Sequence, residues 1–289
     1  MPNPFYGNPA IPASSSLAAA RITLQQSLLP YPQFLNALVN NYIGYSFYNA
    51  FTFKAERRFA QGFSLLASYT ASKLMDIMQG TGRPGAVGGA GVQDWYNLRG
   101  ERARSYQDVP QRLVATGTWQ IPYKPSNAAL RAIAGGWQVN GIWTWQSGFP
   151  IGLTASSTGV NNRPNVVAGV SQAATSQSIT SWFNNIPAGQ PGSAFALPPA
   201  YTFGNVSRTL PNINGPRYFD VDASIFKDFK LRERYKFQFR AEAYNLTNTP
   251  SFSVPVASVT SATFGQVTST SNGGPLHYRE LQLSMRFSF

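Results

Sequence analysis

The sequence predicts an all-β fold, an antiparallel transmembrane β-barrel segment in which about seven long strands form part of a barrel. Three observations predict it. Apolar and polar residues alternate with period two in seven runs, each run covers about eleven residues, and the connections between runs alternate between short and long. The runs cover residues 49–59, 63–73, 111–121, 137–147, 219–229, 235–245 and 279–289.

The length of the runs separates a membrane wall from a soluble sheet. Strands of soluble proteins are mostly about 5–6 residues long, whereas a tilted strand that crosses a bilayer needs about 9–11 residues. All seven runs have the longer length. We therefore expect the apolar side of each run to face lipid, and the side rich in charged, Ser, Thr and Gln residues to face a wet lumen.

The apolar residues of each run share one side of the strand, because successive side chains point to opposite faces. They occupy the odd positions of every run, which is an accident of loop lengths. The first four runs contribute Phe51, Phe53 and Ala55, then Phe63, Leu65 and Ala67, then Leu113, Ala115 and Trp119, then Val139, Trp143 and Trp145. The last three contribute Val221, Ala223 and Ile225, then Phe237, Phe239 and Ala241, then Leu281, Leu283 and Met285.

The connections follow the outer-membrane arrangement of short periplasmic turns and long external loops. Residues 60–62, 122–136 and 230–234 form the shorter set, and residues 74–110, 148–217 and 246–278 form the longer set. Residues 164–207 carry no charge, and we interpret them as part of an external loop that contacts ligand, is disordered, or packs over the barrel mouth.

Two regions are predicted. Residues 1–48 form an external loop segment with a short helix expected over residues 14–29, capped by Ser and ended by Pro30. Residues 49–289 form the C-terminal strands of an outer-membrane β-barrel. The first and last of the seven strands run in the same direction, and no signal peptide is visible, so we expect the chain to be part of a larger protein.

Aromatic residues gather near the ends of the predicted strands. Amphipathic rings at both interfaces form the girdles of a membrane barrel. The predicted girdle comprises Phe59, Phe63, Tyr69, Trp137, Trp145, Phe219, Phe229 and Tyr235.

Charged residues of the last three strands fall on the even, lumen-facing side. Asp220 and Asp222 share this face, but no calcium-loop pattern surrounds them. We expect a network of lumen charges instead, comprising Asp220, Asp222, Lys236, Arg240, Glu242 and Arg286.

The final strand combines a terminal aromatic residue with apolar residues at every second position before it. Such an extended amphipathic end suits recognition by strand addition. We predict an assembly signal, read by the barrel assembly machinery and also facing lipid, formed by Leu281, Leu283, Met285, Phe287 and Phe289.

Composition excludes several functions. The chain has no Cys and a single His, His277, so it offers no thiolate metal site and no His cluster. The net charge of +12 does not lie on one stripe, and basic residues collect around the predicted periplasmic turns, so no nucleic-acid partner is expected. The Gly-rich residues 80–91 lack a phosphate-binding pattern. We expect no enzyme, no cofactor and no catalytic or metal-binding residue.

Nine short motifs, in order, resemble the C-terminal barrel of TonB-dependent transporters of the Oar-like type. They are residues 3–7 (NPFYG), 31–34 (YPQF), 62–73 (GFSLLASYTASK), 108–113 (DVPQRL), 135–139 (GGWQV), 146–150 (QSGFP), 162–165 (NRPN), 239–248 (FRAEAYNLTN) and 281–289 (LQLSMRFSF).

The resemblance implies the last seven strands of a 22-stranded barrel in the bacterial outer membrane, with substrate uptake as the function. The family's plug and TonB-contacting segment are absent from this sequence, so the chain is expected to be inactive alone and to reach the TonB system only through that missing part. Outer-membrane lipid is the expected direct partner. The alternative is a soluble or surface-attached β-sandwich that binds a glycan or a protein.

Overall fold

The computed structural model describes residues 1–34, 43–77, 92–155, 163–200, 202–230, 235–270 and 278–289. The chain divides into two compact units, Met1–Gly44 and Tyr45–Phe289. His277 and residues 80–91 lie outside the described residues. No helix in the described part of the chain is long and apolar enough to cross a membrane.

The first unit is organised around the buried Asn3. Its Nδ2 atom donates to the carbonyl oxygens of Leu17 at 2.6 Å and Ala19 at 2.7 Å. A buried amide of this kind holds the following loop against the start of the chain.

The prediction of a helix over residues 14–29 is wrong. The structure has the short 3-10 helix η1 (Ser16–Ala18) and the single-turn helix α1 (Leu24–Ser27). Between them Arg21 pairs with Pro2 in an isolated bridge, and Thr23 is extended, with its side chain accepting from the Gln26 backbone N–H at 3.1 Å. Pairing with the first residues and an N-cap at Thr23 therefore interrupt the helix.

Seven long strands of the second unit form what we call the wall, and they confirm the predicted runs to within three residues at each end. They are β1 (Ser46–Ala60), β2 (Phe63–Asp76), β4 (Gln111–Gln120), β5 (Trp137–Gln146), β10 (Tyr218–Lys230), β11 (Lys236–Tyr244) and β12 (Glu280–Ser288).

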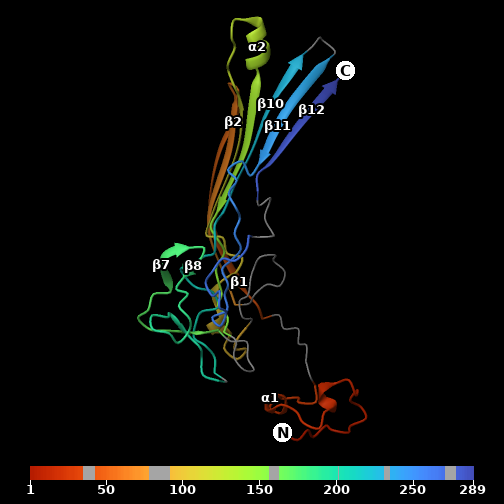
Figure 1. The fold of residues 1–289 in the computed structure, drawn as a ribbon, viewed down its shortest axis with the longest axis vertical. Coiled ribbons are helices and arrows are strands. Elements are labelled where there is room, and N and C mark those ends of the chain that lie inside the picture. Colours follow the sequence, from red (N-terminus) through yellow and green to blue (C-terminus); the bar gives the residue numbers. More distant parts are fainter. Residues whose placement is uncertain (35–42, 78–91, 156–162, 201, 231–234, 271–277) are drawn as a thin grey trace. The chain divides into compact units, whose positions relative to one another are not determined.

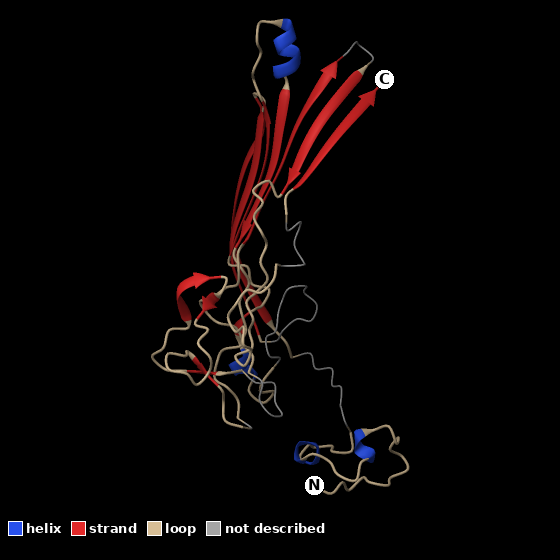
Figure 2. Ribbon diagram, viewed as in Figure 1, coloured by secondary structure: helices blue, strands red, loops and turns tan. Residues whose placement is uncertain are grey.

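The wall is an open antiparallel sheet in the order β1-β2-β4-β5-β10-β11-β12, with the short strand β3 (Ala103–Arg104) paired to β2 (Figures 1 and 2). Each strand pairs with its neighbour along the chain, so β1 and β12 form the two edges and run in the same direction. Among the described residues no second long sheet packs on the apolar face.

The register joins the apolar sides of the seven strands into one face. Odd residues pair with odd residues except near the β1–β2 turn, where a register shift between Arg57 and Ala60 pairs Ala60 with Phe63. One unbroken row is Arg57, Leu65, Gly117, Gly141, Ala223, Ala243 and Leu281. Directly paired residues share a face. This row starts near the end of β1 and finishes near the beginning of β12, so the strands are staggered as they are in a barrel wall.

Two connections join neighbouring strands at one end of the wall. The β1–β2 turn places Gln61 at φ 54° and Gly62 at φ 79°, the left-handed pair that suits a tight hairpin. The β4–β5 connection carries α2 (Ala128–Ala134). The Lys227 Nζ donates to the carbonyl oxygens of Ala132 and Ile133 at the C-terminus of α2, where a cation is favoured.

The long connections pack together beyond the other end of the wall (Figure 2), and we call their described residues the loop layer: 77, 92–110, 147–155, 163–200, 202–217 and 245–270. The layer contains β3, the 3-10 helix η2 (Leu98–Glu101), the pair β6 (Asn165–Val166) and β9 (Phe195–Ala196), and the hairpin of β7 (Ala173–Ser178) and β8 (Ser181–Phe183).

An apolar core lies inside the loop layer. Phe183, Phe195 and Phe264 meet edge to face, with ring centroids 5.1–6.4 Å apart. Around them Leu153, Val206 and Leu210 are buried. The described part of residues 164–207 supplies both short strand pairs and two rings of this core. Contact with ligand and packing over the barrel mouth stay predictions.

Candidate functional site

The predicted girdle residues lie on the odd face toward both ends of the wall, apart from Phe59, which falls in the register shift between Arg57 and Ala60. Phe53, Tyr69, Leu113, Trp145 and Phe219 stand directly opposite one another in one row across five strands. Because β1 begins at Ser46 and β2 continues to Asp76, Phe53 and Tyr69 lie inside their strands. The other three residues of the row are close to strand ends. The stagger of a tilted wall accounts for this difference.

The remaining girdle residues lie toward the turn end of the wall. Tyr235 stacks on Phe287 with ring centroids 5.8 Å apart, and Phe229 lies 6.0 Å from Phe237. Trp137 meets Phe239 at 6.2 Å. Phe59 and Phe63 flank the β1–β2 turn. The girdle role of these rings stays a prediction.

The structure brings together some of the predicted lumen charges. Lys236 forms an ion pair of 2.9 Å with Asp228, and Arg240 lies 3.6 Å from Glu242. Asp222 instead accepts the backbone N–H of Asn245 at 3.0 Å through its Oδ1. The charges therefore form separate local contacts along the even face.

Two predicted lumen residues stand apart from these pairs. Arg286 lies opposite Gln238 in the β11–β12 register, and Asp220 lies opposite Thr144. Nearer the middle of the even face, neutral residues connect the strands: Thr118 donates to Asn140 at 3.0 Å, and Asn140 donates to Ser224 at 3.1 Å. A polar, cross-linked face is what a wet lumen needs.

The predicted assembly residues form the exposed side of the edge strand β12. Leu283 and Met285 are 71% and 70% exposed, and Phe289 is 90% exposed. Leu281 and Phe287 lie on the same side. Their backbone pairs with β11 on one edge, so the opposite edge of β12 has no strand partner among the described residues.

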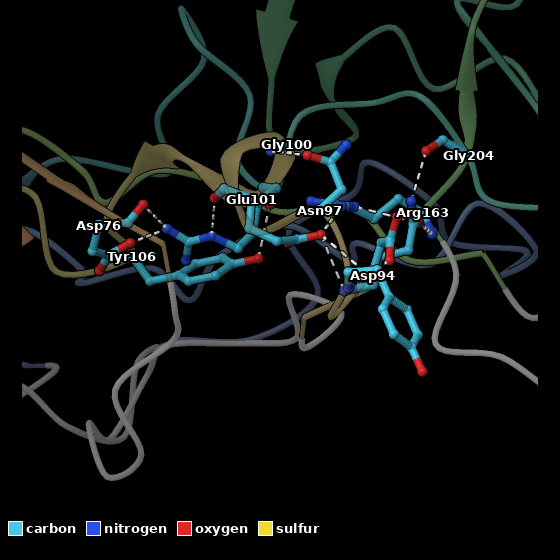
Figure 3. Close-up of polar contacts among 11 residues, drawn as sticks. Asp76, Asp94, Asn97, Gly100, Glu101, Tyr106, Arg163 and Gly204 are labelled. Atoms are coloured by element: carbon cyan, nitrogen blue, oxygen red, sulfur yellow. Dashed lines mark hydrogen bonds and ion pairs between the residues drawn. The ribbon is translucent and has the colours of Figure 1, made fainter. Parts of the chain in front are cut away.

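A cluster of polar residues ties the loop layer to the end of β2, and we call it the loop clamp: the half-buried Asp76 and the buried Glu101, Tyr106, Arg163 and Arg208. Figure 3 shows Asp76, Glu101, Tyr106 and Arg163. Arg163 donates from Nη2 to the Glu101 Oε1 at 2.7 Å, and their side chains are only 4% and 1% exposed. A buried ion pair is held in place when further hydrogen bonds satisfy its atoms.

Glu101 is held by its own neighbourhood. Its Oε1 atom also accepts the backbone N–H groups of Gln93 at 3.1 Å and Asp94 at 3.4 Å. Gln93 in turn accepts the Arg163 backbone N–H at 3.0 Å and donates to the Gly204 carbonyl at 2.9 Å. Two segments far apart in sequence are thus joined by side-chain amide and carboxylate groups.

Arg208 provides the second half of the clamp. Its side chain is fully buried, pairs with the Asp76 carboxylate and donates from Nε to the Glu101 carbonyl at 3.1 Å. The guanidinium also lies over the Tyr106 ring, 5.4 Å from its centroid, while the Tyr106 hydroxyl donates to the Arg208 carbonyl at 2.9 Å. Arg208 therefore connects β2, η2 and the loop before β10.

Burial changes the pKa values of the Arg208 guanidinium and the Tyr106 hydroxyl. It lowers the pKa of Arg208 to about 10, so the guanidinium stays charged at neutral pH. Burial also raises the pKa of Tyr106 above its ordinary value, which keeps the hydroxyl a neutral donor.

A neighbouring salt bridge extends the clamp toward the wall. Asp108 is buried, accepts the Leu74 backbone N–H at 2.7 Å and pairs with the Arg104 Nε at 2.9 Å. Thr209 donates to the Arg104 carbonyl at 2.8 Å. Asp108 begins the motif at residues 108–113, so that motif attaches the third strand of the wall to the second.

Sequence reasoning missed the loop clamp as a site. Its signal is the long uncharged segment 164–207, which has Arg163 at one end and Arg208 at the other. Long uncharged segments are ordinarily interpreted as linkers, but a buried arginine at each end holds this segment in place. Within the described residues, no three His, Cys, Asp or Glu side chains are placed to hold a metal ion.

A staggered antiparallel wall with one apolar and one polar face, continued by packed loops at one end, defines a transmembrane β-barrel protein. The family model described as an outer membrane beta barrel domain matches residues 1–282, and the chain belongs to this family. The protein is therefore located in the outer membrane. Comparison with curated proteins and with solved structures gives no match.

Proposed function

We propose that the wall is part of a larger barrel in a TonB-dependent transporter of the Oar-like type, and that it serves substrate uptake across the outer membrane. The observation that carries this proposal is the open sheet, whose edge strands β1 and β12 run in the same direction. An open edge in lipid leaves backbone groups unpaired, at a cost of several kcal/mol each.

The direction of the two edge strands limits how the wall can close into a barrel. Direct pairing of β12 with β1 would be parallel, whereas bacterial outer-membrane barrels are antiparallel with an even number of strands. Two copies side by side in the membrane would meet with the same parallel junction. An odd number of further strands restores antiparallel pairing at both edges, which supports a barrel larger than this sheet.

The order of the nine motifs supports the finer assignment, because several of them have specific structural tasks. Asp108 in residues 108–113 joins two wall strands, and Arg163 in residues 162–165 belongs to the loop clamp. The packed loop layer also suits a receptor, because rigid loops can present a defined surface to a ligand.

The first test is the reading frame upstream of Met1. We expect an in-phase frame that encodes a plug with a TonB-contacting segment and further strands. The full gene product should then bind the purified periplasmic domain of TonB, and the 289-residue chain should not. An in-phase stop codon just before Met1, together with insertion of this chain alone as a closed barrel, would contradict the transporter proposal.

We also propose that the exposed side of β12 is recognised by the barrel assembly machinery. Phe289→Ala should lower the folded fraction in the outer membrane, measured as the heat-modifiable band on a gel. Ser288→Ala on the opposite side is the matched control and should leave that fraction unchanged. Equal folding of both variants would contradict an assembly role for the terminal ring.

A further inference from the structure

We propose that a groove at the loop-layer end of the wall seats the saccharide headgroup of a glycolipid in the outer leaflet. The groove has a volume of about 1010 Å³ and lies between the wall and the β7–β8 hairpin. It adds a specific lipid-binding site to the protein and does not depend on the transport proposal.

The chemistry of the lining matches a sugar. The rings of Trp145, Trp182, Phe219 and Phe252 line the groove together with the amides of Gln177, Asn212 and Asn214. Apolar faces of sugar rings pack against aromatic rings, and their hydroxyl groups need amide partners. None of the described residues that line the groove is acidic, and the exposed Arg217 is one of them, which also suits a phosphate attached to the sugar.

The floor is polar backbone held close together. A Cβ atom at Gly148 would lie 1.8 Å from the Gly215 carbonyl oxygen, so only glycine permits the two segments to meet. Trp182 is fixed above them by donating from Nε1 to the Asn214 carbonyl at 2.7 Å. The Asn214 Oδ1 atom is buried and has no hydrogen-bond partner among the described residues.

The position of the groove indicates that the sugar belongs to a lipid. Trp145 and Phe219 are directly paired odd residues, so they belong to the apolar face of the wall and to the groove at once. Both are in the row of rings nearest the loop layer, the level at which girdle residues meet headgroups. The groove is therefore continuous with the lipid-facing surface of an outer-membrane protein.

The test measures lipid binding to the full chain extracted from the outer membrane in mild detergent, by native mass spectrometry. Three probes are compared: rough-type lipopolysaccharide, its deacylated core saccharide, and phosphatidylglycerol. We expect lipopolysaccharide to bind at least about tenfold more tightly than either of the others, a difference of about 1.4 kcal/mol.

Two variants address the groove without removing the packed rings. Ala173→Trp fills it from the exposed hairpin, and Arg217→Gln removes its cation; each should lower the affinity for lipopolysaccharide about tenfold. Ala168→Trp, an exposed alanine of the same loop layer outside the groove, is the matched control and should bind like the unchanged chain.

Three results would overturn the proposal. Equal binding of phosphatidylglycerol would mean that the sugar is not recognised. Equal binding of the deacylated saccharide would assign the groove to a soluble glycan instead of a lipid. Unchanged lipopolysaccharide binding in both groove variants would place the lipid elsewhere on the wall.

Discussion

The wall exposes its apolar residues, whereas the loop layer buries its own. Leu283 on β12 is 71% exposed, while Phe183 and Phe195 in the loop layer are fully buried. In the described part of the second unit, every buried apolar residue lies outside the seven wall strands. The same polypeptide therefore has an apolar surface that faces lipid and, in the loop layer, a buried apolar core like that of a soluble protein.

The two regions also differ in how charges are held. Lys236 and Asp228 pair on the even face of the wall with partly exposed side chains. Glu101 and Arg163 pair in the loop layer almost without exposure. The wall pair is weakened by water, whereas the loop pair depends on both partners being present, because an unpaired buried charge is costly.

The largest expected effect comes from breaking the buried pair of the loop clamp. Arg163→Met leaves Glu101 buried without its partner and should destabilise the loop layer by about 3–5 kcal/mol. Hydrogen exchange of residues 92–108 and 163–200 in the detergent-extracted chain measures this. Adding Glu101→Gln should recover part of the loss. If the double variant loses as much stability as the two single variants lose together, the pairing of the two charges is not the dominant interaction.

The next effect tests the apolar face of the wall. Ala241→Arg, near the middle of β11, or Val139→Arg, in the same row of the odd face on β5, places a charge in lipid and should lower the unfolding free energy by about 2–4 kcal/mol. Thr116→Arg on the even face of β4 is the control and should cost much less. The measurement is urea unfolding of the chain in lipid vesicles, and equal losses on both faces would contradict the assignment of the faces.

A smaller effect is expected at a close contact inside the loop layer. Gly152→Ala would put a Cβ atom 1.9 Å from the Tyr106 hydroxyl oxygen and 2.6 Å from the Arg208 carbonyl oxygen. Displacing both groups should cost about 1–3 kcal/mol and raise the rate of proteolysis in the loop layer. Gly169→Ala, which meets no atom within 4 Å but has a positive φ, controls for backbone strain alone. Equal proteolysis of both variants would argue against steric packing at Gly152.

The smallest effect is expected for a single hydrogen bond. Tyr106→Phe keeps the ring under the Arg208 guanidinium but removes the hydroxyl that donates to the Arg208 carbonyl. The loss should be about 0.5–1.5 kcal/mol in the loop layer, with unfolding of the wall unchanged. A loss as large as that of Arg163→Met, measured by the same hydrogen exchange, would show that the hydroxyl has a greater role than one bond.

The wall could be predicted almost completely from the sequence. Alternation with period two is a local property, and it placed β4 and β5 to within one residue at each end. The prediction failed for residues 14–29, where the sequence suits a helix but Arg21 pairs with Pro2 and Thr23 starts a new turn. Partners distant in sequence overrode local propensity there.

The sequence by itself therefore determined which residues form strands, which side of each strand is apolar, and the class of protein that results. Only the tertiary structure decided that Arg163 and Arg208 are buried, that three phenylalanines build a core in the loops, and that Trp145 shares a groove with Trp182. The physical reason is the separation in sequence between the residues that make contact. Strand periodicity is written in adjacent residues, whereas these contacts join segments separated by tens of residues, and no local pattern encodes which of them meet.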